Sequence, residues 1–254
     1  MLTHALFALR AADIATLAAV LLFSGTVKGL LGIGLPLIAV PLLSQFVELP
    51  AAVAVMTVPM AASNVGQAFE GGRTIAAVKA LWPIMAAVIV GTVIGVHLLI
   101  SIDRRRLDVV IGVSFILLAA ALLCLPRVRI RRGTEVWAGP LVGLAAGVLG
   151  GMSAMFGPPL VAYLVGLGLD PDSFVKRIAI LVFGANMALL LALGGSGSMS
   201  LSDFLISAAA VVPIQIGMPL GRRLRRWVPP TIFRGAVLVF LALAGLGMLR
   251  RGLF

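Results

Sequence analysis

Long apolar runs separated by short polar connections follow one another along the whole chain. Six runs have the length of one helix across a membrane, since a hydrocarbon core roughly 30 Å thick needs about 20 mostly apolar residues. The pattern therefore predicts an all-α polytopic membrane protein. The six runs cover residues 51–69, 75–100, 107–125, 174–193, 204–220 and 232–249.

Two further runs, residues 14–46 and 136–166, are too long for one simple crossing. A continuous helix of about 30 residues would extend about 45 Å at 1.5 Å per residue. Glycine and proline interrupt both near the middle, as Lys-Gly-Leu-Leu-Gly-Ile-Gly-Leu-Pro over 28–36 and Gly-Gly-Met-Ser-Ala-Met-Phe-Gly-Pro-Pro over 150–159. Each run is predicted to be a broken helix or a re-entrant hairpin.

The two halves of the chain align with each other at an offset of 122 to 123 positions, which indicates an internal duplication. We predict a first transmembrane repeat over 1–126, a basic cytoplasmic linker over 127–135 and a second repeat over 136–254. Each repeat has four segments and opens with the broken one. The matching positions are Gly34 with Gly157, Pro36 with Pro159, Asn64 with Asn186, Gly71-Gly72 with Gly194-Gly195, and Ile94-Gly95 with Ile216-Gly217.

The positions of the basic residues favour inverted repeats. If the broken segments return to their starting face, each half crosses three times and the second half is inverted. Thirteen basic residues then lie on one face and six on the other, whereas full crossings divide them almost evenly. The positive-inside rule makes the larger set cytoplasmic and puts both termini outside. The larger set is Arg73, Lys79, Arg127, Arg129, Arg131, Arg132, Lys176, Arg177, Arg222, Arg223, Arg225, Arg226 and Arg234; the smaller is Arg10, Arg104, Arg105, Arg106, Arg250 and Arg251.

Composition excludes several classes of function. Hydrophobic residues make up 61% of the 254 positions and charged residues 11%, so little remains for a soluble domain. The net charge of +11 is explained by arginines in loops that face lipid headgroups, not by a nucleic-acid surface. One cysteine and two histidines, without clustering, predict no metal site, no cofactor and no catalytic dyad, and hence no enzyme.

The two breaks are where a polar ligand is expected to bind, because backbone groups that a helix leaves unpaired are tolerated only beside a cavity. Half-helices beginning at Gly34 and Gly157 would offer N–H donors and partial positive charge to an anion. Lys28 lies beside the first break, and its alternative role is a side chain that reaches the interface. The candidate substrate-binding residues are Lys28, Gly32, Gly34, Pro36, Asn64, Ser153, Gly157, Pro159, Asn186 and Gln215.

The equivalent positions of Asn64 and Asn186 suggest a shared cavity, although each amide could instead bond a neighbouring helix or the broken backbone. All carboxylates lie at or near the ends of the runs, so no deep proton relay is predicted. His97 is the one candidate for proton coupling, against a structural role near a helix end.

The segment Ser24-Gly-Thr-Val-Lys28-Gly-Leu-Leu-Gly-Ile-Gly-Leu-Pro36, the Pro41-Leu-Leu that follows and the echo Gly157-Pro-Pro-Leu160 resemble the TauE/SafE sulfite-exporter family. The size and duplicated layout look similar over the whole chain. The resemblance implies export, or sometimes uptake, of sulfite, organosulfonates or related small anions across a bacterial inner membrane. An anion channel and an uptake permease for another organic anion are the alternatives. The lipid bilayer is the other expected partner, and the pair Gly91 and Gly95 would pack within one protomer or between the two of a homodimer.

Overall fold

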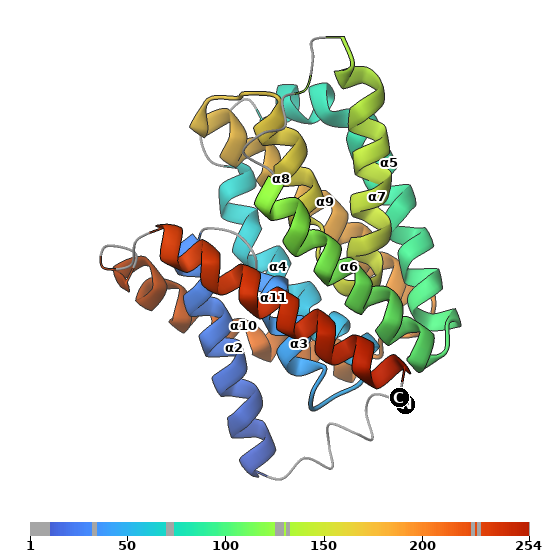
Figure 1. Ribbon diagram of the computed structural model, residues 1–254, viewed down its shortest axis with the longest axis vertical. Helices are drawn as coiled ribbons and strands as arrows, with labels where there is room; N and C mark the ends of the chain where they lie inside the picture. The colour runs from blue at the N-terminus through green and yellow to red at the C-terminus, as the bar shows by residue number, and fades with distance from the viewer. Residues whose placement is uncertain are drawn as a thin grey trace.

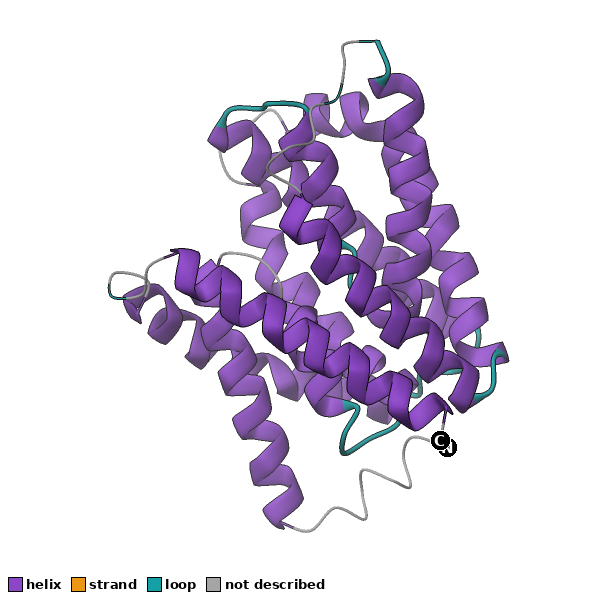
Figure 2. Cartoon of the chain, viewed as in Figure 1, coloured by secondary structure: helices purple, strands orange, loops and turns teal. Residues whose placement is uncertain are grey.

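The computed structural model describes residues 11–31, 35–69, 74–124, 130, 133–224, 227 and 230–253. Within these ranges all regular structure is helical and no strand occurs, which confirms the all-α prediction (Figures 1 and 2). The first half of the chain holds α2 (Ala11–Leu31), α3 (Leu35–Leu43), α4 (Leu49–Phe69), α5 (Thr74–Ser101) and α6 (Arg104–Cys124). The second holds α7 (Glu135–Ser153), α8 (Gly157–Gly166), α9 (Pro171–Gly195), α10 (Leu201–Leu224) and α11 (Pro230–Leu253).

Several helices have the length and apolar character of membrane spans. Among the described residues four qualify on both counts, within Ala77–Ser101, Glu135–Ser153, Ser173–Gly195 and Leu201–Leu224. Large apolar side chains such as Trp82, Leu141 and Leu191 are exposed on the outside of the bundle. An apolar exterior of this kind is stable against lipid and costly in water. The fold is that of a polytopic membrane protein.

The helix pair α7 and α8 doubles back on itself. Between them, Ala154 adopts a left-handed conformation with φ of 59° and donates its N–H to Gly150 O. At the other end of the pair, Tyr163 Oη donates to Glu135 O over 3.4 Å, and Ile130 N donates to Gly166 O over 2.8 Å. The end of α8 therefore lies beside the start of α7.

Helices of the first half of the chain pack against helices of the second half. The first-half helix α2 packs along the second-half helix α10, and the first-half helix α5 packs along the second-half helix α7, as Figure 1 shows. The helices α4 and α9 contact each other, α4 also contacts α10, and α9 contacts α5. The helices α6 and α11 form a further pair. Every one of these pairings has its counterpart when the two halves are interchanged.

Glycines allow these helices to approach at backbone distance. A Cβ added at Gly217 of α10 would collide with the backbone of Leu22 and Thr26 in α2. In the same way, a Cβ at Gly95 of α5 would collide with the backbone of Val148 in α7. Helices in membranes associate mainly through such close van der Waals contact between small residues. The small-residue pair predicted for α5 thus packs inside the protomer.

Candidate functional site

The centre of the candidate site is the ammonium of Lys28, near the end of α2. Its side chain is only 3% exposed. The ammonium donates to Ser63 Oγ over 2.6 Å and to Asn64 Oδ1 over 3.3 Å, both on α4. Lys28 is therefore turned into the bundle and does not extend to the surface.

No carboxylate balances this ammonium among the described residues. The ion pairs that occur there are Arg104 with Glu48 and Arg106 with Asp103, both at the ends of helices. Ser63 and Asn64 are neutral, and an ammonium has three hydrogens of which they accept two. A buried cation without a counter-ion is costly, so this position attracts an anion.

A hydrogen bond within α4 and a backbone contact between α2 and α10 hold Asn64 and Lys28 in this geometry. Asn64 Nδ2 donates to Met60 O one turn earlier in α4 over 2.7 Å, which leaves its Oδ1 facing Lys28. The turn of α2 that carries Lys28 is anchored by Gly29, which packs directly against the backbone of Met218 in α10. Lys28 and Asn64, both predicted from the sequence, thus lie together.

Asn186 of α9 lies elsewhere and has different partners. It is fully buried, and its Nδ2 donates to Thr57 O of α4 over 2.7 Å. Its Oδ1 has no hydrogen-bond partner among the described residues. The sequence suggested a shared cavity for the two asparagines, but in the structure each amide has its own hydrogen-bond partners. Asn186 bonds the backbone of a neighbouring helix, which is the alternative role, whereas Asn64 bonds a carbonyl of its own helix and accepts from Lys28.

The predicted binding residues around the two breaks differ in their burial and in their hydrogen bonds. Gly32 and Gly34 lie outside the described residues, whereas Pro36 is buried in α3. Ser153 is buried and donates to Leu149 O of its own helix. Gly157 and Pro159, both half-buried, stand in the first turn of α8, but Pro158 and Pro159 lack the N–H groups expected to bind an anion. Of the first three residues of α8, only Gly157 therefore has an N–H to offer to an anion.

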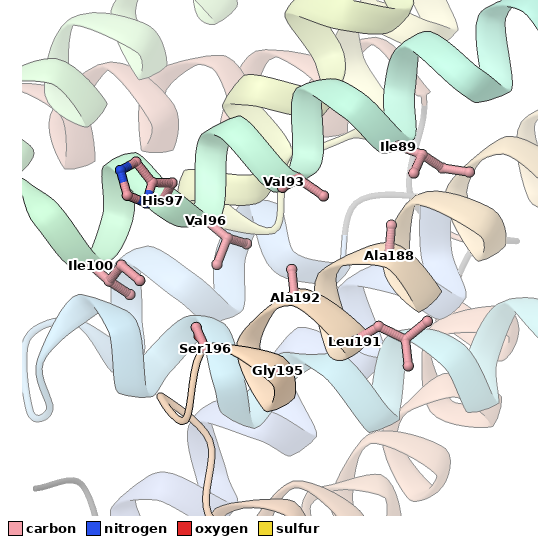
Figure 3. Close-up of a pocket in the computed structure, with 10 residues that line it drawn as sticks. All are labelled: Ile89, Val93, Val96, His97, Ile100, Ala188, Leu191, Ala192, Gly195 and Ser196. Atoms are coloured by element: carbon pink, nitrogen blue, oxygen red, sulfur yellow. The ribbon is translucent and has the colours of Figure 1, made fainter.

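Gln215 and His97 are exposed and do not join the Lys28 group. Gln215 follows Ile214, a buried residue of α10 that contacts Gly25 of α2, and its own side chain is exposed. His97 lines a largely apolar groove of about 460 Å³ between α5 and α9. In Figure 3 the groove runs from Ile89 at one end to His97 and Ile100 at the other, with Leu191 contributed by α9 and with Ser196, the residue that follows α9.

A second cavity of about 370 Å³ lies where α4, α5, α6 and the α9–α10 connection meet. It is the more polar of the two, since Glu48, Arg104, Asp108 and Ser198 line it. The Arg104–Glu48 pair at this cavity is exposed and spans 3.5 Å. Exposed pairs of this kind contribute little to stability.

Two hydroxyls, those of Ser63 and Ser207, were missed as site residues by the sequence interpretation. The position of Ser63 directly before Asn64 was a usable signal, because both side chains accept from Lys28. Ser207 of α10 forms hydrogen bonds with residues of α4 that lie about 150 positions earlier in the sequence, and no local sequence pattern indicates that contact.

A family model described as sulfite exporter TauE/SafE matches residues 17–248, which is most of the chain. The chain belongs to the TauE/SafE sulfite-exporter family. The resemblance seen in the sequence is thereby confirmed, and this TauE/SafE protein is a membrane transporter of the sulfite-exporter type. Its family is one of transporters and not of enzymes. Searches among curated proteins and among solved structures returned no match.

Proposed function

We propose that this TauE/SafE protein is a secondary transporter that exports small sulfur-containing anions, such as sulfite or organosulfonates, across the bacterial inner membrane. The observation that carries the proposal is the buried ammonium of Lys28, which has two neutral partners and no carboxylate partner within the described part of the chain. A transported anion would supply the missing charge and accept the remaining hydrogen. Because the ammonium lies beside the first break, the anion would bind between the two broken segments.

Alternating access would follow from two inverted repeats, 1–126 and 136–254, joined by a cytoplasmic linker over 127–135. Two features support this arrangement. The contacts that return α8 to the start of α7 are those expected of a hairpin that re-emerges on its own face. The pairing of α2 with α10 and of α5 with α7 is the one expected for two repeats related by a pseudo-two-fold axis. Rocking of the repeats would open the Lys28 position to one face and then to the other.

The membrane potential alone would favour export. Moving one negative charge outward across an inside-negative membrane gains about 2.3 kcal/mol per 100 mV. A carrier without proton coupling would therefore suffice, which agrees with the position of the described carboxylates near helix ends. His97 stays the candidate for proton coupling should the flux require a proton gradient.

The proposal is tested with labelled sulfite and organosulfonates in proteoliposomes, at a membrane potential of either sign and without a proton gradient. For the intact chain we expect saturable flux in the direction that the potential favours for an anion. Lys28→Met should abolish this flux, or raise the half-saturating concentration at least about tenfold, which corresponds to 1.4 kcal/mol.

The matched control is Lys79→Met, which removes the charge of an exposed lysine of α5 and should leave the affinity unchanged. Correctly folded Lys28→Met that transports with unaltered affinity would exclude Lys28 as an anion ligand. Non-saturating flux with large single-channel currents would instead identify an anion channel. Flux that is driven only inward would identify an uptake permease.

A further inference from the structure

A second polar cluster lies in the interior of the bundle, where α4, α9 and α10 meet. Pro59 interrupts α4 there, because a proline has no N–H to donate to the carbonyl four residues earlier, that of Val55. In place of the missing backbone N–H, Ser207 Oγ of α10 donates to Val55 O over 2.9 Å. The same oxygen accepts from Val58 N over 3.1 Å. A side chain of α10 thus replaces backbone hydrogen bonds that α4 has lost.

The side chains of this cluster are Thr57, Asn186 and Ser207, and both of its hydroxyls already donate to backbone carbonyls. Thr57 Oγ1 donates to Ala54 O over 2.8 Å, and Ser207 Oγ donates to Val55 O. Asn186 Nδ2 donates to Thr57 O over 2.7 Å, which fixes the orientation of the amide, since the reverse orientation would set two acceptors against each other. The atom left without a partner is Asn186 Oδ1, an acceptor.

The unpartnered oxygen Asn186 Oδ1 is stabilised by a ligand that is either a cation or a hydrogen-bond donor. Thr57, Asn186 and Ser207 are each completely buried, so bulk water does not reach them. Leaving a buried polar atom unpaired costs more than an average hydrogen bond contributes. A transported anion is the wrong ligand here, because it presents acceptors of its own. Asn186 therefore does not belong to the anion site.

We propose that this cluster binds a monovalent cation, Na⁺, between α4, α9 and α10. The cluster offers neutral oxygens only: the side-chain oxygens of Asn186, Thr57 and Ser207 and the backbone carbonyls of Val55 and Thr57, which belong to one set of linked hydrogen bonds. Carbonyls exposed by interrupted membrane helices are the ligands that transporters use for Na⁺. The cluster contains no carboxylate, and no group of three or more acidic, histidine or cysteine side chains suited to a metal occurs among the described residues. A divalent ion, which prefers carboxylates, is therefore not the expected ligand.

The cation site and the two hydrogen-bond partners of Lys28 share helix α4. Thr57 and Asn64 are seven residues apart, or about 10 Å along a helix. Two positive charges at that spacing would both attract an anion bound between them. Na⁺ and the anion are therefore expected to increase each other's affinity by the same factor.

The first test is equilibrium binding of radioactive Na⁺ to the purified full-length protein, with choline replacing Na⁺ as the competing salt and no sulfur anion present. Saturable Na⁺ binding to the intact chain is expected. Asn186→Ala and Ser207→Ala should each lose it, whereas Ser114→Ala, which removes a hydroxyl bonded only to Val110 O of its own helix, should keep it. Absence of saturable binding to the intact chain would overturn the proposal and assign the acceptor to a buried water.

The second test is the melting temperature in Na⁺ compared with choline at equal ionic strength. A ligand that binds only the folded state raises this temperature with its concentration. The intact chain and Ser114→Ala should show the Na⁺-dependent rise, and Asn186→Ala should not. An equal rise in Asn186→Ala would place the cation elsewhere. Both tests omit the anion, so they can succeed or fail independently of sulfite transport.

Discussion

Lys28 is unusual among the described residues, because its long, flexible cationic side chain is almost completely buried inside the bundle. Two neighbours in sequence, Ser63 and Asn64, accept from it across helices. In the second half, Gly150 lies 122 positions after Lys28 and packs directly under the ring of Phe156. Glycine has no side chain, so the second half has no ammonium at this position.

Replacing Ser63 by alanine tests how the ammonium is satisfied without substrate. The variant loses a hydrogen bond to a charged group, so we expect a decrease of about 1.5–3 kcal/mol in stability. A saturating sulfur anion should restore part of this loss, because it would give the ammonium a new partner. Thermal melting with and without anion measures both effects.

The control for this variant is Ser114→Ala, whose hydroxyl bonds only its own helix. Its melting temperature should stay within the error of the intact chain, with or without anion. If the anion raised the melting temperatures of Ser114→Ala and Ser63→Ala by the same amount, the rise would be a general effect of salt. That result would contradict a role of Ser63 at Lys28.

At the scale of elements, the helices follow from the apolar runs and their packing follows from glycine. The predicted run 51–69 corresponds to α4, Leu49–Phe69, and the run 174–193 lies within α9, Pro171–Gly195. Runs of leucine, valine and alanine make a helix apolar on all sides, so such a run does not reveal which helix it contacts. The glycines carry that information, because they mark where another backbone comes close.

Gly147→Ala is expected to weaken the packing of α7 on α5. A Cβ at this position would collide with the carbonyl of Val88 and the backbone N of Thr92, and backbone atoms in two packed helices cannot easily move aside. Overpacking of this kind costs about 1–3 kcal/mol. A lower melting temperature and a smaller yield of folded protein should result.

Gly194→Ala is the matched control, because a Cβ at that glycine of α9 has no atom within 4 Å. It should be neutral or slightly stabilising, since alanine favours helix more than glycine does. If both variants melted at the same temperature as the intact chain, close backbone contact at Gly147 would not be limiting.

At the scale of the whole molecule, the direction in which each broken segment leaves the membrane decides the topology. Hairpins would put Trp137 and Trp227 on one face and Leu201 on the other, whereas full crossings would separate the two tryptophans. All three side chains are exposed, so cysteines placed there are accessible from the aqueous phase or the interface. In a Cys124→Ala background, a membrane-impermeant maleimide added outside should label Leu201→Cys and spare Trp137→Cys and Trp227→Cys.

Labelling after permeabilisation is the control, since all three cysteines should then react. Reaction of position 137 but not 227 from one side of intact cells would contradict the hairpins and the inverted repeats with them. The same result would leave the contacts of Lys28 unchanged, because these lie within one half of the chain.

The sequence alone determined that the chain is an all-α membrane protein, where its helices lie, and that a lysine beside a glycine-rich break is a candidate anion ligand. These features depend on local composition and on the 20-residue length that a bilayer requires. Only the tertiary structure decided that Lys28 contacts Ser63 and Asn64, that Asn186 contacts Thr57, and that Ser207 contacts Thr57 from another helix. Contacts between helices depend on the rotation and depth of each helix, and uniformly apolar helices do not encode these locally.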